Sequence, residues 1–141
     1  MTSFEERITI IGLILSLASA LTYAAILTIR AVTDGLALTE AAWQGPLMLT
    51  IGMGGGLYGL VYLIGIIRSR GQRLTDERDT QIRARSEVAA SGLTGIGVLA
   101  ALIMLALNAD TFWVAHTLLL LTWLGSIAGA SAALAAYRTG L

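Results

Sequence analysis

Most of the side chains able to make strong, specific contacts lie between residues 68 and 87. This stretch holds six of the nine arginines and four of the nine acidic residues. Arginine binds carboxylates and phosphates through paired hydrogen bonds, and a surface of mixed charge suits a specific protein partner better than bulk lipid. The pattern predicts a partner-docking surface with these candidate residues: Asp76, Glu77, Arg78, Asp79, Arg83 and Arg85. The alternative is that the charges only orient the chain and cap a solvated helix, with Asp79 and Arg83 paired one turn apart.

His116 is the only histidine, and it lies near the start of an apolar run. An ionisable side chain in such a place is a candidate functional group: it could relay a proton, ligate a haem or chlorin, or share a cation with Asp110 and Glu40. A lone histidine supplies only one ligand, so the simpler interpretation is a hydrogen bond to a carbonyl group or to water. We therefore predict no bound metal or cofactor, and His116 remains the one candidate ligand.

No combination of residues favours catalysis. The chain has no cysteine, which excludes disulfides, thiolate catalysis and cysteine-based metal sites. It also has no nucleophile with an adjacent base, no HExxH pattern and no phosphate-binding loop. The formal net charge is zero, which provides no basic field for nucleic acid. We predict that the protein is not an enzyme and does not bind nucleic acid.

The composition predicts a single membrane domain. Of the 141 residues, 56% are hydrophobic and only 13% are charged, and the mean hydropathy is +0.78. Soluble domains carry roughly a quarter charged residues, and a chain this short cannot bury so much apolar surface in its own core. Four apolar runs are each long enough to cross a hydrocarbon core of about 30 Å. They cover approximately residues 8–30, 46–67, 88–108 and 112–137.

A cleaved signal peptide is the alternative interpretation of the first run, with Ala18-Ser19-Ala20 as its cleavage site. Two features disfavour it. The preceding segment contains Glu5 and Glu6 and is net acidic, whereas a signal peptide begins with basic residues. The apolar run also continues without a break to Ile29.

The distribution of arginine predicts the orientation. An inside N-terminus places eight of the nine arginines on the inner side and only Arg30 outside, as the positive-inside rule requires. The sequence thus predicts an all-α, antiparallel four-helix bundle in a bacterial inner membrane, with both termini cytoplasmic. The short turn 108–110 should make the last two helices a hairpin, and Trp43 should anchor the outer interface. The third helix should begin near Asp76 and extend into the cytosol by roughly ten residues, or about 15 Å.

Glycines at helical spacing predict close helix packing. Small residues four positions apart let two helices approach to van der Waals contact in a membrane. The candidate packing residues are Gly52, Gly55, Gly56, Gly59, Gly125 and Gly129. The glycines of the second run could instead expose carbonyl groups to a substrate, as in broken transporter helices. A set of hydroxyl-bearing residues could line a polar path beside them, although such residues more often hydrogen-bond between helices. These are Ser16, Thr22, Tyr23, Thr50, Tyr58 and Tyr62.

The run Asp76-Glu77-Arg78-Asp79 precedes Ile82, Arg85 and Ser86 at the start of the third apolar run. This arrangement resembles a family of small uncharacterised bacterial membrane proteins with four spans and a DERD-type motif between the second and third. The resemblance implies an architecture and no activity. We therefore predict a non-catalytic accessory or interaction protein of the lipid bilayer, homo-oligomeric or part of a larger membrane complex. It should dock through its cytoplasmic mixed-charge helix, the start of the third helix within the charged segment 68–87. One alternative is a small oligomeric transporter or channel. Another is a pigment- or haem-binding subunit that uses His116.

Overall fold

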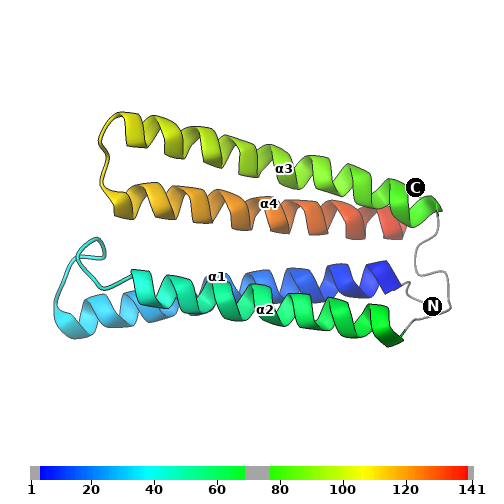
Figure 1. Ribbon diagram of the computed structural model, residues 1–141, viewed down its shortest axis with the longest axis horizontal. Coiled ribbons are helices and arrows are strands. Elements are labelled where there is room, and N and C mark those ends of the chain that lie inside the picture. Colours follow the sequence, from blue (N-terminus) through cyan, green and yellow to red (C-terminus); the bar gives the residue numbers. More distant parts are fainter. Residues whose placement is uncertain (1–3, 69–76, 140–141) are drawn as a thin grey trace.

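The computed structural model describes residues 4–68 and 77–139, which form four α-helices. They are α1 (Phe4–Asp34), α2 (Gln44–Arg68), α3 (Glu77–Ala106) and α4 (Thr111–Thr139), and they run antiparallel in sequence order (Figure 1). All four are long and apolar enough to cross a membrane. The prediction of an all-α bundle of four candidate spans is confirmed, and the chain is a small multi-pass membrane protein.

The ends of the bundle differ in what they carry. Both termini lie at one end, here called the terminal end, and the loops 35–43 and 107–110 lie at the other, called the loop end (Figure 1). Helix α3 begins 11 residues before the third apolar run, at Glu77, so its first turns are polar as predicted. Asp76 lies outside the described residues. Which end faces the cytosol stays a prediction from the arginine distribution.

Helices α1 and α3 end in the same backbone motif. At the end of α1, Gly35 has a φ of 65°, its N–H donates to the carbonyl of Val32 (3.4 Å), and the next N–H donates to Ala31 (2.9 Å). At the end of α3, Asn108 has a φ of 55° and donates to Leu105 (3.0 Å), and the next N–H donates to the carbonyl of Met104 (2.9 Å). These are Schellman motifs, which satisfy carbonyl groups that a helix end leaves without a partner.

The loop 107–110 joins α3 to α4 in a tight hairpin, as its length predicts. The Asp110 carboxylate accepts a hydrogen bond from the backbone N–H two residues later, at 2.7 Å, and so caps the start of α4. Helix α3 then packs along α4 more extensively than any other pair of helices packs. A tight loop and a long contact make these two helices one unit.

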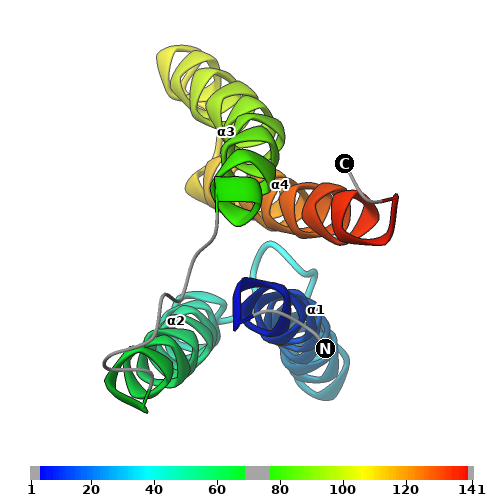
Figure 2. The same cartoon turned by 90° about the vertical axis from the view of Figure 1, so that its right-hand side faces the viewer.

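Helix α1 connects this unit to α2. It packs against both α2 and α4, whereas no comparable packing joins α2 to α3 among the described residues. The end-on view shows α1 below α4, with α2 and α3 on opposite sides of the bundle (Figure 2). The four helices therefore form an open bundle.

The core sits at the loop end. A cluster of buried side chains there joins α1, the loop 35–43, α2 and α4. Trp43 is only 9% exposed and meets the ring of Phe112 edge-on, with centroids 5.9 Å apart. The prediction of Trp43 as an interfacial anchor is wrong, because the loop folds back over the helices and carries this ring inward. The cluster consists of Tyr23, Leu27, Ala31, Ala41, Trp43, Leu47 and Phe112.

Candidate functional site

The His116 ring lies beside this buried cluster and uses both of its nitrogens. Nδ1 lies 2.6 Å from the carbonyl oxygen of Phe112, and Nε2 lies 2.7 Å from the hydroxyl of Tyr23 on α1. A carbonyl oxygen only accepts, so Nδ1 carries a proton; in the neutral ring Nε2 then accepts from the tyrosine. The ring also stacks on Phe112, with centroids 3.8 Å apart.

These contacts make His116 part of the joint between α1 and α4. The partners differ from those expected, since Asp110 caps α4 instead of approaching the imidazole. Residues 4–68 and 77–139 contain no group of three His, Asp or Glu side chains that could hold a metal. Ligation through Nε2 would require breaking the bond to Tyr23. The histidine is thus positioned as a helix-joining residue, which corresponds to the simpler of the two predictions.

The first turns of α3 carry the candidate docking residues in two different environments. Asp79 is buried, with 7% of its surface exposed, and so is Ile82 one turn later. Four candidates are exposed: Glu77, Arg78, Arg83 and Arg85. The side chain of Arg78 donates to the carbonyl oxygen of Tyr137 at 3.4 Å, which ties the start of α3 to the end of α4. A surface of mixed charge is present, but Asp79 is not part of it.

Arg83 forms an ion pair with Glu87, at 2.8 Å, and not with Asp79 as the sequence suggested. Hydrogen bonds to the Glu87 carboxylate and to the Tyr62 hydroxyl raise the pKa of Arg83. Tyr62 belongs to α2, so the start of α3 lies near α2 at the terminal end.

The predicted packing glycines also divide into two groups. A Cβ added to Gly125 would lie 2.7 Å from the backbone oxygen of Ala90, and one added to Gly129 would lie 2.9 Å from the Cβ of Ala90. Helix α3 therefore approaches α4 closely at both positions. In α2 the corresponding space is empty, and an added Cβ would meet nothing within 4 Å. This holds for Gly52, Gly55, Gly56 and Gly59.

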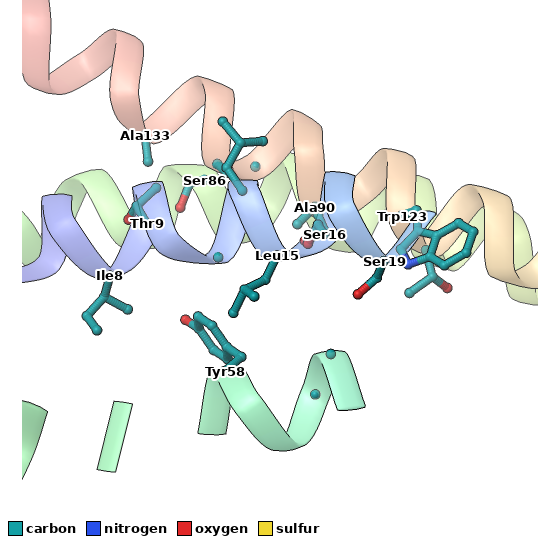
Figure 3. Close-up of a pocket in the computed structure, with 18 of the residues that line it drawn as sticks. Ile8, Thr9, Leu15, Ser16, Ser19, Tyr58, Ser86, Ala90, Trp123 and Ala133 are labelled. Atoms are coloured by element: carbon teal, nitrogen blue, oxygen red, sulfur yellow. The ribbon is translucent and has the colours of Figure 1, made fainter. Parts of the chain in front are cut away.

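A cavity of about 850 Å³ lies between the two hairpins and is lined by residues of all four helices. It runs from Glu5 and Tyr137 near the terminal end to Leu47 and Trp123 beside the buried cluster. Figure 3 shows the ring of Tyr58 reaching from α2 toward α1. That ring rests on Gly12, where an added Cβ would lie 3.0 Å from it.

Part of this lining was predicted. Ser16, Thr50, Tyr58 and Tyr62 were expected to lie along a polar path and do line the cavity, whereas Thr22 does not. Tyr23 instead bonds His116. The sequence analysis did not predict that the carboxylates of Glu5 and Glu87 line the cavity, or that α4 forms part of its wall. Thr122 and Ser126 lie one turn apart in α4, and this spacing of hydroxyl groups could have indicated that α4 lines the cavity.

Fold and composition together define the class, a small multi-pass membrane protein with four candidate spans around a partly open cavity. No protein-family model, no curated protein and no solved structure matches this chain. The resemblance to four-span proteins with a DERD-type motif stays a prediction. The function must therefore be argued from the geometry of this molecule.

Proposed function

We propose that this protein is a non-catalytic assembly protein of a bacterial inner membrane, with both termini in the cytoplasm. It forms a homo-oligomer or serves as an accessory subunit of a larger membrane complex. Helix α2 makes the contact within the membrane, and the mixed-charge start of α3 makes the contact at the cytoplasmic surface.

One observation carries this proposal: α2 packs on α1 with one face, as at Gly54 and Gly65, whereas a Cβ added to its other face meets nothing within 4 Å. Its buried residues, Pro46, Leu47 and Thr50, all lie in the first two turns. Beyond them, Gly52, Gly56 and Gly59 leave a flat surface with free space beside it. Membrane helices associate by van der Waals packing of such surfaces, because lipid offers no hydrophobic force to bring them together. A helix of a second copy fits this surface.

The test is the oligomeric state in liposomes, counted by single-molecule photobleaching of labelled protein. The expected result is an oligomer that Gly56→Leu weakens by about tenfold, since loss of close helix packing costs about 1–2 kcal/mol. Gly92→Leu is the matched control, because Gly92 is an exposed glycine of α3 with equally free space. A wild-type monomer, or equal effects of the two substitutions, would refute assembly through α2.

The cytoplasmic contact is tested separately by charge reversal. Arg85 is exposed on the first turns of α3, and Arg138 is exposed at the end of α4, at the same end of the bundle. Arg85→Glu should release proteins that co-purify from native membranes after cross-linking, whereas Arg138→Glu should retain them. If every partner stays bound to the Arg85→Glu variant, the start of α3 is not the docking surface.

The orientation has a direct test, because the chain contains no cysteine. A single cysteine at Leu38, in the loop 35–43, should react with a membrane-impermeant maleimide in spheroplasts. One at Thr139, near the C-terminus, should react only after the membrane is broken. The reverse labelling pattern would contradict cytoplasmic termini.

Two other candidate functions have weaker support. A transporter or channel is favoured by the cavity, but the cavity stops at the buried cluster around Tyr23 and Phe112. A haem- or pigment-binding subunit is disfavoured because both nitrogens of His116 are hydrogen-bonded. A visible absorbance of the purified protein that His116→Ala removes would reverse that judgement.

A further inference from the structure

The cavity between the two hairpins lies within the part of the chain that crosses the membrane. All four candidate spans line it, and the buried cluster around Tyr23 and Phe112 closes it toward the loop end. Close packing joins α3 to α4, α4 to α1 and α1 to α2, whereas no comparable packing joins α2 to α3 among the described residues. An opening on that side faces the hydrocarbon core of the bilayer, because it lies between two spans.

Most of the cavity wall is apolar. Leu13, Ile51 and Leu118 line it from α1, α2 and α4, and Figure 3 shows Leu15 pointing from α1 toward Tyr58 of α2. The volume of about 850 Å³ falls in the range of about 300–1,000 Å³ that holds drug-sized molecules. Because protein interiors contain few voids larger than a water molecule, a space of this size must be filled in the membrane, either by water or by hydrocarbon.

The hydroxyl groups of the wall favour hydrocarbon over water. Four of them donate to carbonyl groups three or four residues earlier in their own helices, at 2.6 to 2.8 Å, and two bond each other at 3.0 Å. The four are Thr9, Thr50, Ser86 and Thr122, and the pair is Ser16 and Ser126. Ser19, Tyr58 and Trp123 each keep a neutral donor, on three different helices, that makes no hydrogen bond within residues 4–68 and 77–139. A buried water needs about two to four polar partners, so a wall whose hydroxyl protons are mostly in use holds a column of water poorly.

The terminal end of the cavity is polar, in contrast. Arg83 and Glu87 line it and form an ion pair at 2.8 Å, and the Glu5 carboxylate also acts on this guanidinium. Both signs of charge are present and engaged with each other, so this end gives no preference for a cation or an anion. A polar end near the membrane surface and an apolar body toward the middle of the bilayer match the order of headgroup and chain in a lipid.

We propose that this cavity is a binding site for one acyl chain of a membrane phospholipid, taken from the leaflet at the terminal end. The headgroup stays beside Arg83 and Glu87, and the chain passes between α2 and α3 and extends toward Trp123. The site recognises the chain and accepts headgroups of either charge. It is independent of the assembly proposed above, because the glycines assigned to assembly do not line the cavity; they are Gly52, Gly56 and Gly59.

The first test measures what reaches Trp123, which lies near the middle of α4 and lines the cavity. The chain has three tryptophans, so Trp43→Phe with Trp113→Phe leaves Trp123 alone. The full-length variant is placed in phosphatidylcholine vesicles in which part of the lipid carries bromine near the chain end. We expect the brominated chains to quench Trp123 fluorescence and iodide in the aqueous phase to leave it unchanged. Quenching by iodide would mean a water-filled cavity and overturn the proposal, as would no quenching by bromine.

A second substitution separates a chain in the cavity from lipid around the bundle. Gly55→Leu should remove most of the quenching of Trp123, because Gly55 lines the cavity and has free space into which the leucine extends. Gly92→Leu is the matched control: Gly92 has equally free space on α3 but does not line the cavity. Trp113, which is 55% exposed and outside the cavity, should be quenched equally in both variants when it is the single tryptophan. Unchanged quenching of Trp123 in Gly55→Leu would assign the effect to surrounding lipid and overturn the proposal.

Native mass spectrometry tests the unsubstituted protein, so the proposal does not depend on the folding of any variant. The protein is delipidated in mild detergent and then supplied with equal amounts of phosphatidylcholine and phosphatidylglycerol. We expect one phospholipid to be retained per chain, with the two headgroups retained alike. Bare protein alone, or retention of phosphatidylglycerol alone, would overturn recognition of the acyl chain.

Discussion

Two sets of glycines with similar spacing, one in α4 and one in α2, meet opposite surroundings. In the α3–α4 hairpin, glycines let two helices approach until a methyl group would no longer fit, as at Gly125 and Gly129. In the α1–α2 hairpin, Gly52, Gly56 and Gly59 face empty space. Both sets have the spacing that allows close packing in a membrane. Spacing therefore identifies a surface able to pack, and only the fold decides whether the partner is in the same chain.

The two hairpins also differ in which helix surfaces remain available to another molecule. A helix pair in close contact, such as α3 and α4, has used the facing surfaces of its two helices within the chain. Helix α2 instead leaves a glycine surface with free space beside it. The proposed contact within the membrane lies on this surface, and substitutions in the two hairpins should therefore differ in what they damage.

The largest expected effect follows from filling a used glycine. Gly125→Leu should destabilise the protein by about 3 kcal/mol or more, because overpacking forces the helices apart and the nearest atom is a backbone oxygen that cannot rotate away. The atoms it would meet are the backbone oxygen of Ala90 and the hydroxyl of Thr94. The measurement is unfolding of the monomer in mixed micelles by circular dichroism.

Gly56→Leu is the control in the other hairpin, and it should leave the stability of the monomer unchanged or slightly raised, because leucine favours the helix more than glycine does. Equal destabilisation by the two substitutions would mean that the hairpins do not differ in packing as described.

Much of the fold could be predicted from the sequence, because a span of about 20 apolar residues and a three-residue turn leave few alternatives. The four helices and the loop 107–110 follow from these constraints. The environment of Trp43 could not be predicted in this way. An amphipathic ring near a span end fits the membrane interface and a packed loop equally well, and only the course of the loop 35–43 decides between them.

The cavity and the docking surface were harder to predict, because they depend on which distant parts of the chain pack together. Ser16 and Ser126 are 110 positions apart, and nothing in their local sequences indicates that their hydroxyls bond each other between α1 and α4. Asp79 looked like its acidic neighbours, yet it is buried whereas Glu77 is exposed. Local sequence supplies the chemistry of a side chain, whereas its burial depends on which helix packs over it.

A second prediction concerns the joint between the two hairpins. Tyr23→Phe removes the hydroxyl that bonds Nε2 of His116 and should cost about 1 kcal/mol, the usual value for such bonds between membrane helices. Thermal unfolding in detergent measures the loss. Tyr58→Phe is the matched control, because its hydroxyl makes no hydrogen bond within residues 4–68 and 77–139. If Tyr58→Phe lowers the stability as much as Tyr23→Phe does, the loss of stability in Tyr23→Phe does not come from the hydrogen bond to His116.

The helix ends give a third prediction of similar size. Gly35→Ala and Asn108→Ala both place an alanine at a positive φ, and each should cost about 1 kcal/mol. Asn108→Gly should be neutral or stabilising by a few tenths of a kcal/mol, because glycine adopts this conformation without strain. Chemical unfolding of the three variants checks the order. If Asn108→Gly were as damaging as Asn108→Ala, the asparagine side chain and not the backbone would hold the turn.

The smallest effect is expected where charge is most exposed. Glu87→Gln breaks the ion pair with Arg83. The side chain of Arg83 is 54% exposed and that of Glu87 is 64% exposed. Solvent and salt screen such a pair, so the loss should not exceed about 0.5 kcal/mol, and it should vanish at 1 M salt. A large loss of stability that persists in high salt would instead show that the pair of Arg83 and Glu87 holds the start of α3 in place.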